Sequence, residues 1–208
     1  MSKIQYGQVF ATPVGTVDRV LNNIDSVLTD VNAIYHDYRT TSHFVTNYQR
    51  DMPAVTYWDT LDIVSKYPQL QTIVDQLQPH VDEYARNVAG RLINVQRSTS
   101  WLCYQDRNSF HPKHNHWART VDGNVSAHNI NAIVYLQAEA GDQLELFWPT
   151  PLAALSQPDP LFSSDRAAKI DLINNRAIII PSWVDHGCEA RKRTTQKICM
   201  SINYQYKK

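Results

Sequence analysis

Near the start of the chain, the apolar positions change from strand-like to helical spacing. Residues Tyr6 to Val14 alternate enough to predict an opening strand, and Pro13-Val14-Gly15 is expected to end it. From Val17 onward, apolar side chains recur every three or four residues, which is typical of an amphipathic helix with one buried face. This first helix is expected to end near residues 36–38.

A polar stretch separates this helix from a second helical region. Thr40 to Tyr57 predicts a long loop, and loops of this length often cover a functional site. A short helix is expected over residues 58–67. Pro68 then opens a longer helix, because proline is favoured in the first helical turn, and its apolar stripe runs from Leu70 to Val88.

From residue 93 onward, the apolar pattern becomes period two or continuous, which predicts strands. The expected strands cover residues 93–104, 109–117, 130–137, 144–148, 169–173, 177–180 and 197–206. Seven or eight such strands can close as a two-sheet jelly roll. We therefore predict a mainly β protein with flanking helices (α+β). Its double-stranded β-helix core, of the cupin-like kind, would span residues 93–208, and the helical residues 1–92 would pack against it.

Turn residues separate these strands. Gly141-Asp142 and Asn174-Asn175 are turn residues, and the second is expected to form a tight hairpin that leads the next strand toward His186. The stretch from Pro149 to Asp165 contains four prolines, so it predicts an extended surface loop that shapes a substrate groove.

Length and charge narrow the possible functions. The 208 residues predict a single domain, long enough to bury a core without disulfide or metal staples. Lys plus Arg number 20 and Asp plus Glu number 20, so the net charge does not indicate a nucleic-acid or membrane partner. The basic run Arg191-Lys192-Arg193 is expected to be a solvated hairpin loop, with phosphate binding as the alternative.

Cysteine usage and the N-terminal sequence bear on location. Cys103, Cys188 and Cys199 are an odd number without a close pair, and the chain starts without an apolar signal core. No apolar stretch approaches the ~20 residues needed to cross a bilayer. We therefore expect a reduced, cytoplasmic protein.

Histidines cluster in one part of the sequence. Four of the eight lie between residues 111 and 128: His111, His114, His116 and His128. Alternate side chains of a strand share a face, so His114 and His116 provide half of a metal site. His186 follows the buried strand expected over residues 177–180 and is expected to supply the third ligand. Imidazole suits iron, zinc, copper or nickel, and non-haem iron(II) oxygenases use an open face of three ligands.

Several short motifs follow one another in the second half of the chain. They are Trp101, His114-x-His116, Ile133-Val134-Tyr135-Leu136, Pro181-Ser182-Trp183, His186-Gly187, Lys197-Ile198 and Ile202-Asn203. In this order the chain resembles the iron(II)/2-oxoglutarate-dependent oxygenases, specifically the small prolyl-hydroxylase-like group of phages and bacteria. The resemblance covers roughly residues 95 to 205. It implies that His114, His116 and His186 hold Fe(II), and that Lys197 binds the far carboxylate of 2-oxoglutarate.

Two positions depart from the family pattern. His116 stands where most relatives carry Asp or Glu, although the phage-type group often has His-x-His. Lys197 stands where Arg is more frequent, and lysine offers a point charge rather than a bidentate fork. Three arrangements of the metal site therefore stay open: three histidines, a carboxylate supplied by Asp122 or Asp185, or water in place of His116.

The resemblance also implies residues around the ligands. The residues expected to line the 2-oxoglutarate pocket are Trp101, Tyr104, Tyr135 and Cys199. Ordinary core packing is the alternative for the aromatic members of this set. His111 and His128 are expected to be polar rim residues, and the alternatives are a hydrogen bond to a metal ligand or contact with the substrate.

The function implied by the resemblance is oxidative. Fe(II), 2-oxoglutarate and O2 would hydroxylate an unidentified small-molecule or peptidyl substrate, with release of succinate and CO2. Two alternatives stay open: a cupin-like module that binds a metal or ligand without turnover, and a three-histidine dioxygenase independent of 2-oxoglutarate. A phage-encoded member of this group would work in the host cytoplasm.

Overall fold

The structure is a computed structural model that describes residues 4–9, 12–40, 54–56, 62–89, 94–116, 118–121, 124–147 and 167–207. Its N-terminal elements are β1 (Gln5–Val9), β2 (Thr12–Asp18), α1 (Ile24–Thr40), β3 (Ala54–Thr56), α2 (Ile63–Lys66), the 3₁₀ turn η1 (Pro68–Leu70) and α3 (Gln71–Ala89). The strands that follow are β4 (Val95–Gln105), β5 (His111–His114), β6 (Ala118–Val121), β7 (Asn124–Ala127), β8 (Ile130–Gln137), β9 (Gln143–Phe147), β10 (Ala167–Asp171), β11 (Arg176–Pro181), β12 (His186–Cys188) and β13 (Lys197–Tyr206).

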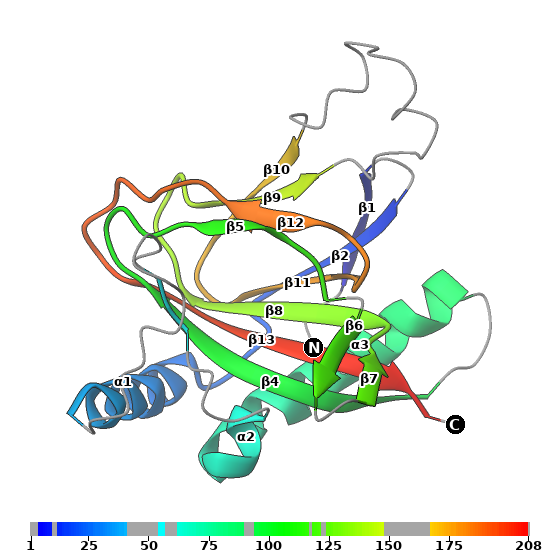
Figure 1. The fold of residues 1–208 in the computed structure, drawn as a ribbon, viewed down its shortest axis with the longest axis horizontal. Coiled ribbons are helices and arrows are strands. Elements are labelled where there is room, and N and C mark those ends of the chain that lie inside the picture. Colours follow the sequence, from blue (N-terminus) through cyan, green and yellow to red (C-terminus); the bar gives the residue numbers. More distant parts are fainter. Residues whose placement is uncertain are drawn as a thin grey trace.

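The described strands form two facing sheets and a hairpin. The larger sheet has seven strands in the order β1-β2-β11-β8-β13-β4-β3, and the smaller has four in the order β10-β9-β12-β5. The hairpin pairs β6 with β7. The smaller sheet lies on one side of the larger sheet, and α1 and α2 lie on the other (Figure 1). This is the jelly-roll arrangement predicted from the sequence.

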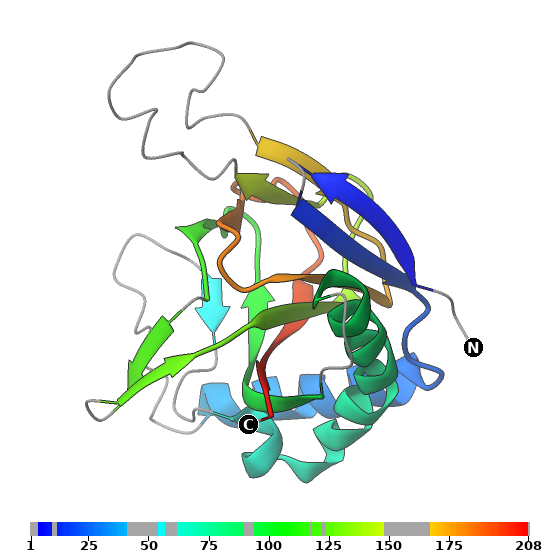
Figure 2. The ribbon, with the colours of Figure 1, turned by 90° about the vertical axis from the view of Figure 1, so that its right-hand side faces the viewer.

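The larger sheet is buried on both faces because each face has its own apolar core. The core on the helix side combines side chains of α1, α2 and α3 with one face of β4, β8, β11 and β13. The core on the inner side combines the opposite face of these strands with the smaller sheet. Figure 2 shows the same layers from the side, with the helices below and to the right of the sheets. Burial on both faces explains why these strands appear as nearly continuous apolar runs.

Strand prediction is most accurate in the middle of the larger sheet. The bounds of β8 and β13 are those predicted, and β4, β9, β10 and β11 differ by a few residues. The short strands β3, β6, β7 and β12 were not predicted, because three or four residues do not show a periodic pattern. The predicted Asn174-Asn175 turn is present, with Asn175 at a φ of 61°. It is not the expected hairpin, because it joins β10 of the smaller sheet to β11 of the larger sheet.

The N-terminal prediction was wrong in one respect. The single strand expected over residues 6–14 is an antiparallel pair, β1 and β2, and β2 continues to Asp18 instead of giving way to a helix at Val17. Pairing with β11 holds this segment extended. The strand stops at Arg19, whose φ is 53°, and α1 starts at Ile24.

Three predicted segments fall partly or wholly outside the described residues. Of the loop expected over residues 40–57, the structure describes Thr40 and the strand β3; of the helix expected over residues 58–67, it describes residues 62–67. The proline-rich loop, residues 149–165, lies entirely outside. None of the helices in the described part of the chain is long and apolar enough to cross a membrane.

Candidate metal centre

Two short neighbouring strands bring three histidines together. β5 and β12 are antiparallel, and their register pairs His114 with His186. The chain continues past β5 to His116, whose backbone N–H donates to the carbonyl oxygen of Ser182 at 2.8 Å. Ligand nitrogen atoms of His114, His116 and His186 all lie within 4.8 Å of one another. The structure therefore assembles the three residues that the sequence singled out.

Gly187 allows the two strands to approach this closely. A Cβ atom at this position would lie 2.8 Å from the carbonyl oxygen of His111 and 3.2 Å from that of Pro112. Contacts of that kind with backbone atoms require one strand to move. The glycine after His186 is thus a packing requirement of the histidine cluster.

The Nδ1 atoms of two histidines are engaged by backbone carbonyl groups. Nδ1 of His114 lies 2.8 Å from the carbonyl oxygen of Pro112, and Nδ1 of His186 lies 2.9 Å from that of Val184. Because a carbonyl oxygen only accepts, both Nδ1 atoms carry the proton and donate it. In the neutral ring, Nε2 then keeps its lone pair for a metal ion.

A chain of side-chain amides fixes the tautomer of His116. Asn131 Nδ2 lies 3.4 Å from the carbonyl oxygen of Ile202 and 3.0 Å from Asn203 Oδ1. Asn203 Nδ2 donates to Thr99 Oγ1 at 3.0 Å, so its amide oxygen faces His116. This oxygen accepts a hydrogen bond of 2.9 Å from Nδ1 of His116. All three histidines therefore have Nε2 available as a ligand atom.

Burial keeps these imidazoles neutral. His116 is 7% exposed and His186 is 3% exposed. Desolvation, reinforced by the neighbouring His114, lowers the pKa of His116 to about 3. Desolvation and the two neighbouring rings lower the pKa of His186 well below its usual value, and burial also lowers the pKa of His114. Neutral imidazole is the form that binds a metal ion, so no proton has to be displaced at neutral pH.

The histidine cluster borders a cavity of about 50 Å³ between the two sheets. Its lining includes four residues that the sequence proposed for the 2-oxoglutarate pocket, Trp101, Tyr135, Lys197 and Cys199, together with His111. The Trp101 ring stacks on His116, with 5.1 Å between ring centroids and an interplanar angle of 27°. The histidine cavity therefore combines candidate metal ligands with aromatic and basic side chains.

Lys197 is the cation of this cavity. It is 3% exposed, and no hydrogen bond or ion pair joins its ammonium to another residue within the described ranges. Asp142 attracts it electrostatically but forms its ion pair with Arg191. A buried charge without a direct partner is unfavourable by roughly several kcal/mol. An anionic ligand is the expected complement of Lys197.

Tyr104 lies on the opposite face of the larger sheet, contrary to expectation. It pairs with Ile198 of β13, and both side chains belong to the core on the helix side. The Tyr104 hydroxyl donates to the carbonyl oxygen of Val31 at 2.7 Å. Because side chains alternate along a strand, it is the neighbouring Cys103 that reaches the histidine cavity.

Two further candidates lie away from this cavity. His128 is buried, and its Nδ1 lies 2.9 Å from Ser98 Oγ. Asp185 accepts a hydrogen bond of 2.7 Å from Asn115 Nδ2 and lies 3.4 Å from Lys113 Nζ, so it is not part of the histidine cluster. Asp122 is outside the described residues.

Sequence reasoning missed most of the polar residues that surround the histidines. Asn203 belonged to a quoted motif but had no role assigned, and Asn131 was not considered. A signal was present on β13, where Lys197, Cys199 and Asn203 occupy alternate positions and so share one face. The matching face of β8 becomes known only from the strand register.

Comparisons with known proteins identify the class of fold. Neither protein-family models nor curated protein sequences give a match. Among solved structures, the fold is that of the prolyl-hydroxylase-like 2-oxoglutarate-dependent oxygenases. At identities of 10–16%, the likeness shows the fold alone.

Three of these structures illustrate the likeness. HygX from Streptomyces hygroscopicus, solved with nickel, 2-oxoglutarate and hygromycin B, has a TM-score of 0.60 at 12% identity over 93% of this chain and 82% of its own. A prolyl hydroxylase from Trichoplax adhaerens, in complex with a hypoxia-inducible-factor peptide fragment, has a TM-score of 0.58 at 16% identity over 92% and 82%. The collagen prolyl hydroxylase of Paramecium bursaria Chlorella virus-1, as a 2-oxoglutarate complex, has a TM-score of 0.55 at 12% identity over 94% and 96%.

Replacing Asn203 tests the orientation of His116. Asn203→Leu removes the oxygen that accepts from Nδ1, so the ring loses its fixed tautomer, and we expect Fe(II) affinity to fall about 10- to 100-fold. Asn203→Asp retains an oxygen acceptor and is expected to bind at least as tightly as the wild type. Anaerobic titration with Fe(II) measures both. Equal affinities for the wild type and the Leu variant would show that the amide chain does not orient His116.

The lowered pKa of His116 predicts a pH dependence of stability. Unfolded histidine titrates near pH 6.5 and folded His116 at about 3, so below pH 6.5 the unfolded chain binds more protons and stability is lost. Between pH 7 and pH 5 this group contributes about 2 kcal/mol to that loss. Urea unfolding of the metal-free protein measures the slope. His116→Gln is expected to flatten it, and an identical slope in the wild type and the variant would refute the assignment.

Proposed function

We propose that the protein is an Fe(II)- and 2-oxoglutarate-dependent oxygenase that hydroxylates a small-molecule or peptidyl substrate and releases succinate and CO2. The observation that carries the proposal is one cavity bordered by three neutral imidazoles and a buried ammonium. Structural neighbours solved with iron, or with nickel and 2-oxoglutarate, support the choice of ligands. Two of the neighbours were solved with hygromycin B and with a peptide fragment bound, which supports both substrate classes.

Each residue of the histidine cavity has a defined task in this proposal. His114, His116 and His186 hold Fe(II) through Nε2, and the bound ion supplies the redox chemistry with O2 and the oxo acid. Lys197 donates charge-assisted hydrogen bonds to the distal carboxylate of 2-oxoglutarate, which burial strengthens. Trp101 and Tyr135 form apolar walls that exclude water from the cavity.

The histidine ligands are already arranged for metal binding in the metal-free protein. The imidazoles are already neutral, and their Nδ1 protons are already donated to Pro112, Val184 and Asn203. Little reorganisation of the ligands is therefore needed when the metal binds. Ligand positions that are fixed beforehand reduce the entropic cost of binding.

The composition of the ligand set favours a second candidate, a three-histidine dioxygenase that does not use 2-oxoglutarate. His116 occupies the position at which most oxygenases of this fold place a carboxylate, and its partner Asn203 is a neutral amide. Such an enzyme has no need of a buried cation to hold a dicarboxylate. Lys197 therefore distinguishes the two candidates and favours the first.

Anaerobic addition of Fe(II) and then 2-oxoglutarate to the metal-free protein tests the proposal directly. A keto acid chelated to Fe(II) gives a weak visible charge-transfer band, which we expect in the wild type. His114→Ala and His186→Ala each remove a ligand and are expected to abolish the band, whereas His36→Ala should retain it. If iron binds to the wild type but neither the band nor succinate appears, the first candidate is wrong.

Lys197→Ala tests the binding of the cosubstrate separately from that of the metal. Loss of a hydrogen bond to a charged group costs about 1.5–3 kcal/mol, so the Kd for 2-oxoglutarate is expected to rise about 10- to 150-fold, while the Kd for Fe(II) changes little. Lys197→Arg keeps the charge and should recover part of the affinity. Lys207→Ala, an exposed lysine just beyond the same strand, serves as the control. Metal-dependent oxidation that is unchanged in Lys197→Ala would favour the three-histidine dioxygenase.

A further inference from the structure

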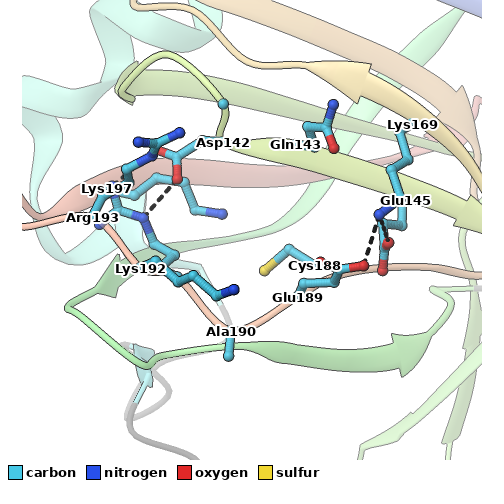
Figure 3. Close-up of a pocket in the computed structure, with 12 residues that line it drawn as sticks. Asp142, Gln143, Glu145, Lys169, Cys188, Glu189, Ala190, Lys192, Arg193 and Lys197 are labelled. Carbon is cyan, nitrogen blue, oxygen red and sulfur yellow. Dashed lines mark hydrogen bonds and ion pairs between the residues drawn. The ribbon is translucent and has the colours of Figure 1, made fainter.

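A second and larger cavity lies beside the histidine cavity. Its volume is about 240 Å³, and it lies between β9, β10 and the segment that runs from β12 to the start of β13 (Figure 3). Lys197 and Cys188 line both cavities. The larger cavity has no task in the proposed oxygenase reaction.

Two groups of charges in the larger cavity are already paired. Lys169 Nζ lies 3.0 Å from Glu145 and 2.7 Å from Glu189, at one end of the cavity (Figure 3). Arg191 donates to both carboxylate oxygens of Asp142 at 2.8 and 2.9 Å. Arg191 and Asp142 cancel, whereas Lys169 between two carboxylates leaves its end of the cavity with a net negative charge.

The remaining cations of the larger cavity are Lys192, Arg193 and Lys197. None of them has a hydrogen bond or ion pair to a carboxylate in the described part of the chain, although Glu189 attracts Lys192 and Asp142 attracts Lys197 electrostatically. In Figure 3 they lie together at the end away from Lys169 and Glu145. One end of the cavity is therefore positively charged, and one of its three cations is buried.

Arg193 and Lys192 are presented by an anchored segment. The guanidinium of Arg193 lies against Gly141, where a Cβ atom would be 2.1 Å from Nη2, so only glycine leaves it this position. The buried Arg191 ties the segment down, because its N–H donates to the carbonyl oxygen of Ser109 and its own carbonyl accepts from the N–H of Asn108. The basic run Arg191-Lys192-Arg193 was expected to be a solvated loop. In the structure, Arg191 is buried, whereas Lys192 and Arg193 line the larger cavity.

We propose that the larger cavity is a second binding site, which takes a small molecule through an oxyanion group, phosphate or carboxylate, held by Lys192 and Arg193, while Lys197 stays with the carboxylate of 2-oxoglutarate. Guanidinium and ammonium groups are the side chains that bind such oxyanions. The volume of the cavity has room for more than the anionic group itself. The inference does not depend on iron or on turnover.

Titration of inorganic phosphate into the metal-free protein tests this site. We expect saturable binding by calorimetry at low ionic strength, weakened at least tenfold in the double variant Lys192→Gln/Arg193→Gln. The matched control is Lys66→Gln/Arg86→Gln, which removes the same charge from exposed positions on α2 and α3 and should change the Kd less than twofold. A parallel titration with malonate distinguishes a carboxylate ligand from a phosphate ligand.

The phosphate and malonate titrations have distinct supporting and contradicting results. Saturable binding of either anion that is lost only in the Lys192/Arg193 variant supports the site and assigns the class of oxyanion. Absence of saturable binding for both anions, or equal weakening in the two double variants, overturns it. Because the titration contains neither iron nor 2-oxoglutarate, its failure leaves the oxygenase proposal untouched, and the charge-transfer experiment tests that proposal without phosphate.

Discussion

Strand β13 lies between β8 and β4 in the larger sheet and presents different side chains to its two faces. Toward the helices it places Ile198, Met200 and Ile202 in the main apolar core. Toward the smaller sheet it places Lys197, and further along the same face Asn203, in contact with the candidate site. Since side chains alternate strictly along a strand, a slip of one residue would move the ammonium into the apolar core and isoleucines into the cavity. The register of β13 is therefore the constraint on which both the core and the site depend.

Burial of polar groups on the inner face is tolerated because nearly every one of them has a partner. An unpaired buried donor or acceptor costs about 1–3 kcal/mol. The chain from Thr99 through Asn203 to His116 satisfies three side chains at once, and Asn131 closes it from the neighbouring strand. Lys197 differs because the nearby Asp142, which attracts it electrostatically, forms its ion pair with Arg191 instead. Burial of the Lys197 ammonium therefore lowers the stability of the protein, and a bound anion would offset this cost. A buried charged side chain that lines a cavity is typical of a ligand site.

Much of the architecture was predictable from the sequence because its signal is local. The strands β8 and β13 are long apolar runs, and His114, His116 and His186 stand out by clustering and by their place after a strand. Tyr104 shows the limit of prediction from local sequence. The face of the sheet on which it lies depends on its pairing with Ile198, and this register is set by the arrangement of all the strands. Arg191 shows the same limit, because a basic run is expected to be solvated until the fold brings Asp142 alongside it from the turn before β9.

The charge of the ligand set connects the two parts of the candidate site. Three neutral imidazoles leave a divalent ion with its full charge, whereas a carboxylate in place of His116 would neutralise part of it. Lys197 adds another positive charge in the same cavity. A dicarboxylate that bridges the metal and Lys197 would therefore be attracted by both, and binding of the metal and of the dicarboxylate would strengthen each other by the same factor. If the protein binds 2-oxoglutarate as proposed, the acidic ligand would come with the cosubstrate instead of with the protein. Both the buried lysine and the third histidine would then have the same physical explanation.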